Sequence, residues 1–115
     1  MGLILGAAQF AQSAQNDGPV FVDATASSGL AANLRGIMAH AAACGDVDDD
    51  GDLDLYVGTF SDRPDEKYTL TSGPVPNMLL INDDGVFRDS GQDTVSFKAR
   101  TSGAAFDDLD NDGDL

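Results

Sequence analysis

The chain has 115 residues, 42% of them hydrophobic, and a formal net charge of −14 at pH 7. A chain of this length forms at most one domain, and its hydrophobic fraction suffices for a core, which argues against global disorder. The negative charge argues against binding to nucleic acid or to anionic membrane surfaces. This charge is concentrated, because the clusters 46–54 and 107–114 hold six and five of the 20 acidic residues.

The first 15 residues contain a short apolar stretch followed by small residues, with a cleavage-like pattern at Ala11-Gln12-Ser13. This pattern predicts a secretory signal peptide, although a basic start is lacking because the first basic residue is Arg35. A disordered tail or a late start codon is the alternative reading of residues 1–15. The apolar stretch is too short to span a membrane.

Segments rich in β-branched and aromatic residues follow, separated by turn-forming residues. Residues 20–25 predict a first strand, residues 27–36 a loop, and the polar stretch 61–76 a surface loop. The Asp83-Asp84-Gly85 sequence predicts a hairpin turn. The remaining β-prone segments predict four consecutive strands, at about 39–46, 53–60, 77–82 and 86–89.

The densest charge lies in the nine residues 46–54, of which six are Asp. Such a density of like charge is unfavourable in a folded chain unless a cation binds among the carboxylates. Gly51 at loop position 6 allows a sharp turn, and oxygen ligands in a flexible loop suit Ca²⁺ rather than zinc or copper. The predicted Ca²⁺ ligands stand at positions 1, 3, 5, 7 (through its carbonyl) and 9: Asp46, Asp48, Asp50, Asp52 and Asp54.

A second copy of this pattern begins 62 residues further on, where Asp108 corresponds to Asp46. Between residues 41 and 53, eight of thirteen positions are identical in the second copy. The position-9 ligand of this copy would be residue 116, so the sequence given holds eight positions of it. The predicted metal ligands in the second loop are Asp108, Asp110, Asp112 and Asp114.

Two other kinds of loop share this composition. An EF-hand begins with the same residues but needs Glu at position 12 and helices on both sides. Position 12 is Val57, inside a β-prone segment, which argues against an EF-hand. A turn that binds no metal remains the alternative interpretation of both loops. This alternative has more weight for the second loop than for the first.

A unit of about four short strands that recurs along the chain is typical of propellers and arrays. The order Asp-x-Asp-x-Asp-Gly-Asp-x-Asp, Leu-Tyr-Val-Gly, Asn-x-Leu-Leu-x-Asn, turn, Phe-x-Asp resembles the FG-GAP/VCBS repeat family over about residues 20–115. The resemblance implies an all-β fold, a fragment of a β-propeller with one complete four-stranded blade at about 39–90. The next blade would start at about 103, and residues 20–25 would be the last strand of a preceding unit. We therefore expect the chain to be part of a longer protein.

The resemblance also implies a function. It predicts a calcium-binding scaffold repeat for protein or glycan recognition, located outside the cell, at its surface or in the periplasm, with Ca²⁺ in a structural role. The expected partners are an extracellular protein or glycan and neighbouring blades of the same parent chain. Nucleic acid and a membrane span are not expected.

The sequence contains no recognisable catalytic constellation, so we expect no enzymatic activity from this segment. The alternative is the propeller portion of a secreted enzyme, such as a polysaccharide lyase, with catalytic residues elsewhere. The single cysteine, Cys44, follows three alanines and is expected to be a small buried residue. Four positions along a strand separate it from His40, too far for a Cys–His pair.

Overall fold

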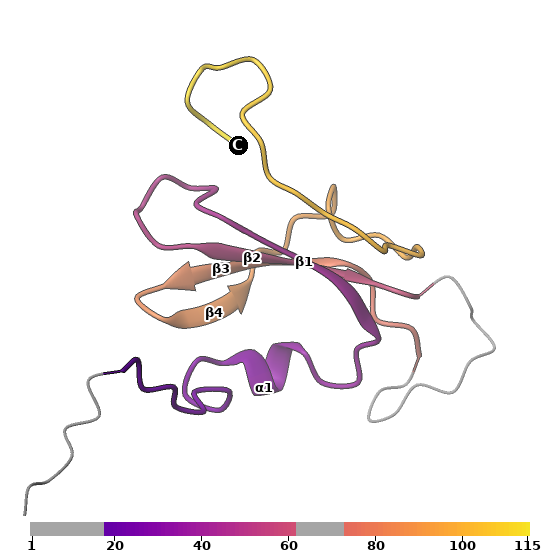
Figure 1. The fold of residues 1–115 in the computed structure, drawn as a ribbon. Helices are drawn as coiled ribbons and strands as arrows, with labels where there is room; N and C mark the ends of the chain where they lie inside the picture. Colours follow the sequence, from indigo (N-terminus) through magenta and orange to yellow (C-terminus); the bar gives the residue numbers. More distant parts are fainter. Residues whose placement is uncertain (1–17, 62–72) are drawn as a thin grey trace, which may run out of the picture.

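The computed structural model describes residues 18–61 and 73–115, and they form one antiparallel sheet beside a single helical turn (Figure 1). The strands pair in the order β1-β2-β3-β4, each hydrogen-bonded to the next in sequence. This arrangement confirms the predicted all-β blade of four strands. In chain order the elements are α1 (Leu30–Asn33), β1 (Ala39–Gly45), β2 (Asp54–Thr59), β3 (Met78–Asp83) and β4 (Val86–Asp89).

Two tight connections set the register of the sheet. The first Asp loop joins β1 to β2, whose last pair is Gly45 with Asp54. The β3–β4 turn consists of Asp84 and Gly85, with φ values of 51° and 85°. Two consecutive residues with positive φ match the right-handed twist of a hairpin, which confirms the turn predicted here.

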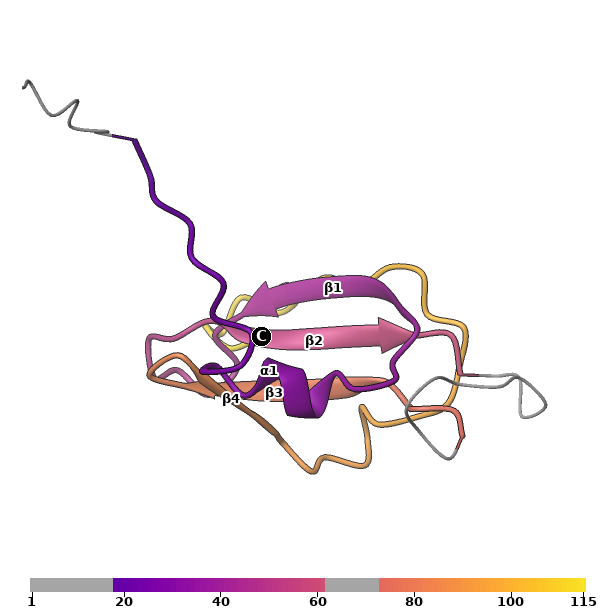
Figure 2. The same cartoon turned by 90° about the horizontal axis from the view of Figure 1, so that it is seen from below.

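The core lies on one face of the sheet and comes mainly from the two central strands. Val57 of β2 and Met78 and Leu80 of β3 are buried, and Leu80 is fully enclosed. Figure 2 shows α1 lying across this face. Its segment adds Leu30 and Leu34 to the core, because residues four apart on a helical turn point to the same side.

Hydrogen bonds attach the α1 segment to the outer strand β4. The Phe87 N–H donates to the Ser28 carbonyl (2.8 Å), and the Asn33 side chain donates to the Phe87 carbonyl (3.0 Å). Residues 27–36, predicted as a loop, therefore contain a helical turn. The hydrogen bonds to β4 and the partial burial of Leu30 against the core favour this turn over an extended loop.

A buried polar network anchors the segment that leads to the second Asp loop. Asn77 is fully buried; its Oδ1 accepts the Thr59 N–H (2.8 Å), and its Nδ2 donates to Thr101 Oγ1 (2.8 Å). Backbone bonds support it, since the Thr101 N–H donates to the Thr59 carbonyl and the Ser61 N–H to the Ala99 carbonyl. This network fixes how the chain leaves the sheet toward residue 103.

Two further sequence expectations differ from the structure. Residues 20–25 form no strand, and Phe21 is 91% exposed, because a strand needs a partner for its backbone groups and none of the described residues pairs with this segment. Cys44 is exposed rather than buried, because β1 is an edge strand and the α1 segment contacts β4 at the opposite edge.

Two other expectations fall partly or wholly outside the described residues. These are the signal peptide or tail at 1–15 and most of the predicted surface loop at 61–76. Within the described ranges, no helix is long and apolar enough to cross a membrane.

Replacing Asn77 with Ala removes the acceptor of the buried Thr59 N–H and the donor to Thr101. We expect Asn77→Ala to lower the free energy of unfolding by about 1–3 kcal/mol, the cost of leaving a buried group unsatisfied. Urea unfolding of the full chain measures this, with Ser102→Ala, at an exposed position nearby, as the control. Equal stability of the two variants would contradict the anchoring role of Asn77.

Candidate metal centre

The first Asp loop is organised around the carboxylate of its first residue. Asp46 Oδ1 accepts the Asp50 N–H (3.1 Å), and Asp46 Oδ2 accepts the Gly51 N–H (3.0 Å). The loop can fold back in this way because Asp49 and Gly51 adopt φ values of 60° and 97°. Glycine takes such values at little cost and Asp tolerates the left-handed region better than most residues, which explains their places in this turn.

The fold-back gathers three carboxylates at one point. Asp46, Asp48 and Asp50 each offer an oxygen, and these atoms all lie within 4.8 Å of one another. Asp50 is oriented in turn by the Asp52 N–H, which donates to its Oδ1 (2.9 Å). The structure therefore brings together the predicted ligands at positions 1, 3 and 5.

Electrostatics make this gathering unfavourable without a cation. Partial desolvation by the loop, and then repulsion from Asp50, Asp54 and Asp46, raise the pKa of Asp48 above its ordinary 3.8. A carboxyl whose folded-state pKa is raised contributes stability below the ordinary value and loses it as the pH rises through the raised value. At neutral pH the Asp48 charge therefore works against the closed loop unless a cation compensates it.

The second loop repeats the first in conformation as well as in sequence. Asp108 Oδ1 accepts the Asp112 N–H (3.2 Å), and its Oδ2 accepts the Gly113 N–H (3.0 Å). Asn111 and Gly113 have φ values of 62° and 104°, matching their counterparts in the first loop. Asp108, Asp110 and Asp112 likewise bring three oxygens within 4.8 Å of one another.

Asp114 occupies the position-7 place in the second loop. Its side chain and then its backbone N–H, which lies 3.3 Å from Asp112 Oδ1, lower the pKa of Asp112 by hydrogen bonding. Asp112 therefore stays ionised and available as an oxygen donor. The same backbone contact occurs between Asp52 and Asp50 in the first loop.

Asp54, the predicted position-9 ligand, has a different environment from the other carboxylates. It is fully buried at the start of β2. Its Oδ2 accepts the Val47 N–H (2.9 Å), and its Oδ1 accepts the Asn82 N–H of β3 (2.8 Å). Asp54 thus joins the loop to two strands, and it lies close enough to Asp48 to raise the pKa of that carboxyl.

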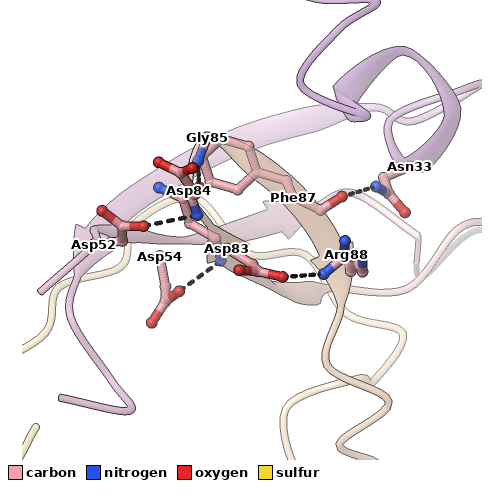
Figure 3. A network of polar contacts seen from close by, with 9 residues as sticks. Asn33, Asp52, Asp54, Asp83, Asp84, Gly85, Phe87 and Arg88 are labelled. Carbon is pink, nitrogen blue, oxygen red and sulfur yellow. Dashed lines mark hydrogen bonds and ion pairs between the residues drawn. The ribbon is translucent and has the colours of Figure 1, made fainter. Parts of the chain in front are cut away.

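The β3–β4 turn braces the first loop from the side, as Figure 3 shows for Asp52 and Asp84. The Asp84 N–H donates to Asp52 Oδ2 (2.8 Å). The Asn82 side chain donates to the Leu53 carbonyl (3.1 Å) and accepts the Gly85 N–H (2.9 Å). Sequence reasoning missed Asn82 and Asp84; the signal was an Asn immediately before the Asp-Asp-Gly turn.

An ion pair lies beyond this brace, between Arg88 and Asp83 of the same hairpin (2.6 Å). Both side chains are 65% exposed, so the pair adds little to stability. The backbone-to-carboxylate bonds of Asp52 and Asp54 are what hold the hairpin turn against the loop.

The donor set of each loop suits a hard cation. Carboxylate oxygens at this density are the ligands that Ca²⁺ prefers, whereas zinc and copper sites generally use Cys or His. Asp46, Asp48 and Asp50 would hold the ion in the first loop, and Asp108, Asp110 and Asp112 in the second. When bound, the ion would supply positive charge that compensates the carboxylates, and no reaction is required of it.

Comparison with known families supports this reading of the fold. The model of the FG-GAP-like repeat family matches residues 46–115, from the first residue of the first Asp loop through the second Asp loop. The chain belongs to the FG-GAP-like repeat family. Comparisons with curated proteins and with solved structures give no match.

Membership in the FG-GAP-like family identifies the four-stranded sheet as a propeller blade. The first Asp loop of this FG-GAP-like repeat occupies the β1–β2 connection. The matched region begins at Asp46 and ends at Leu115, so it contains both carboxylate clusters.

Two conservative substitutions separate the roles of Asp48 and Asp54. In calcium-free protein, Asp48→Asn removes a repelled charge and raises the melting temperature. Asp54→Asn leaves one of two backbone N–H groups without its acceptor and lowers stability by about 1–3 kcal/mol. Thermal unfolding followed by circular dichroism with a chelator measures both, and shifts in the same direction would contradict the distinction.

Proposed function

We propose that this FG-GAP-like repeat is a calcium-binding structural blade of an extracellular scaffold. The observation that carries the proposal is the pair of loops with the same hydrogen bonds and backbone angles, each gathering three carboxylates within 4.8 Å. A single cluster of this kind on an acidic protein is weak evidence for a bound ion. Two with the same internal geometry, at the same place in a repeat, support a common ligand.

The ion would act on folding rather than on chemistry. Without it, the three carboxylates of each loop repel one another, and the β1–β2 connection is favoured to open. With it, the loop closes, and its binding free energy adds to the stability of the hairpin. Carboxylates around a cation are held deprotonated and are poor proton donors, so we propose a non-enzymatic role.

The expected affinity is low, which suits an extracellular site. Asp48 and Asp50 are exposed, and the loops lie at the surface. Extracellular calcium modules bind in the range of about 10⁻⁴–10⁻³ M. FG-GAP-like repeats are typical of extracellular proteins, and we propose the same location for this chain, with a protein or a glycan as the partner of the scaffold.

Calorimetric titration with Ca²⁺ tests the proposal directly. We expect two sites, and a stabilisation of about 1.4–2.7 kcal/mol per site at about 10 mM Ca²⁺ if the dissociation constant is about 0.1–1 mM. Asp50→Ala removes the first site, whereas Asp93→Ala, at an exposed acidic residue outside both loops, leaves binding unchanged.

Mg²⁺ serves as the second control. It demands near-ideal octahedral geometry and gives up its water reluctantly, so it should stabilise the chain less than Ca²⁺ does. Absence of Ca²⁺ binding up to about 10 mM, well above the extracellular range of affinities, would contradict the proposed function.

A further inference from the structure

The second Asp loop makes direct contact with the chain just before the first. Gly45 is buried and immediately precedes Asp46. A Cβ atom placed on Gly45 would lie 2.8 Å from the Leu115 side chain and 2.8 Å from the Phe106 ring. Phe106 and Leu115 therefore pack against the backbone of Gly45 in a space that a side chain would fill.

These two apolar residues flank the second loop on both sides. Phe106 stands two residues before Asp108, and Leu115 directly follows Asp114. In the structure the second loop is folded back on Asp108, and the residues at both of its ends contact Gly45. Closure of the second loop therefore occurs together with the contact to Gly45.

The loops also share a hollow of about 360 Å³, and in Figure 1 the C-terminal loop (yellow) lies above the β1–β2 loop. Acidic residues from both loops line it: Asp46 and Asp49 from the first, Asp112 and Asp114 from the second. Acidic residues of both loops therefore lie around one hollow. A cation bound in either loop changes the electrostatic potential at the other.

We propose that the two loops bind Ca²⁺ with positive cooperativity, coupled through the contact of Phe106 and Leu115 with Gly45. This inference rests on the proposed function and concerns how Ca²⁺ binding at one of the two loops affects binding at the other. A cation in the second loop holds Phe106 and Leu115 together against Gly45, and this contact adds to the Gly45–Asp54 pair from which the first loop starts. The first cation then orders a segment that is already partly ordered.

Charge repulsion between the two ions opposes this coupling. The Debye length is about 8 Å at about 0.15 M salt and about 3 Å at about 1 M, so added salt weakens the repulsion. Packing of apolar groups on Gly45 is not screened. The cooperativity should therefore increase with ionic strength, whereas a purely electrostatic effect between the loops would fade.

The test compares calorimetric Ca²⁺ titrations of the wild-type chain and two single-loop variants, and then of the same three forms in the Leu115→Ala background. Asp48→Ala reports the second loop alone, and Asp110→Ala reports the first loop alone. In the wild-type chain, we expect the product of the two binding constants to exceed the product of these single-site constants about fivefold or more. We call the first product divided by the second the coupling ratio. In the Leu115→Ala background this ratio should be about one, because the contact between Leu115 and Gly45 is removed.

Two further variants control the result. Leu109→Ala removes an apolar side chain from the same loop that is 91% exposed, and it should leave the ratio unchanged. Gly45→Ala adds a methyl group where Phe106 and Leu115 pack, and it should abolish the coupling while both sites still bind.

The outcomes separate the two proposals. Two sites with a ratio of one in the wild-type chain, or a ratio that Leu115→Ala and Gly45→Ala leave unchanged, would overturn the coupling while the proposed function stands. No Ca²⁺ binding by the wild-type chain would overturn both. A ratio above one that rises with salt and is lost in both variants supports the coupling.

Discussion

The structure depends most on the buried carboxylate of Asp54. It accepts one backbone N–H from the first Asp loop and another from β3, so a single side chain joins the loop, β2 and β3. Hydrogen bonds to an ionised acceptor are stronger than neutral ones, and they are most valuable where water is excluded. The base of the loop is therefore fixed by the fold, whereas its tip carries charges that repel one another.

Under the proposed function, this division explains how a blade would use a weakly bound ion. Asp54, together with Asp52 and the β3–β4 turn, holds the loop in place against the sheet. The proposed ion would have only to offset the repulsion among Asp46, Asp48 and Asp50 at the tip. These features lie within the region matched by the FG-GAP-like family, and the second loop repeats the hydrogen bonds of the tip.

Much of the fold followed from local sequence. Each of the four predicted strands lies within one residue of its observed bounds, because β-prone segments alternate with strong turn signals such as Asp84-Gly85. The gathering of Asp46, Asp48 and Asp50 followed from their spacing. Tertiary contacts determined the features that local sequence did not predict. The α1 segment is held by hydrogen bonds to β4, and Cys44 is exposed because it lies on an edge strand. Asn82, 28 residues after Asp54 in sequence, donates a hydrogen bond to that carboxylate at the base of the loop.

Hydrogen exchange of individual backbone amides, followed by NMR with and without Ca²⁺, tests the central claim most directly. The account predicts that the Val47 and Asn82 amides, held by Asp54, are protected in both conditions. The Asp50 and Gly51 amides, held by Asp46 at the tip, should be protected only when Ca²⁺ is present. Loss of protection at Val47 and Asn82 in chelator, or equal protection at Asp50 and Gly51 in both conditions, would contradict the account.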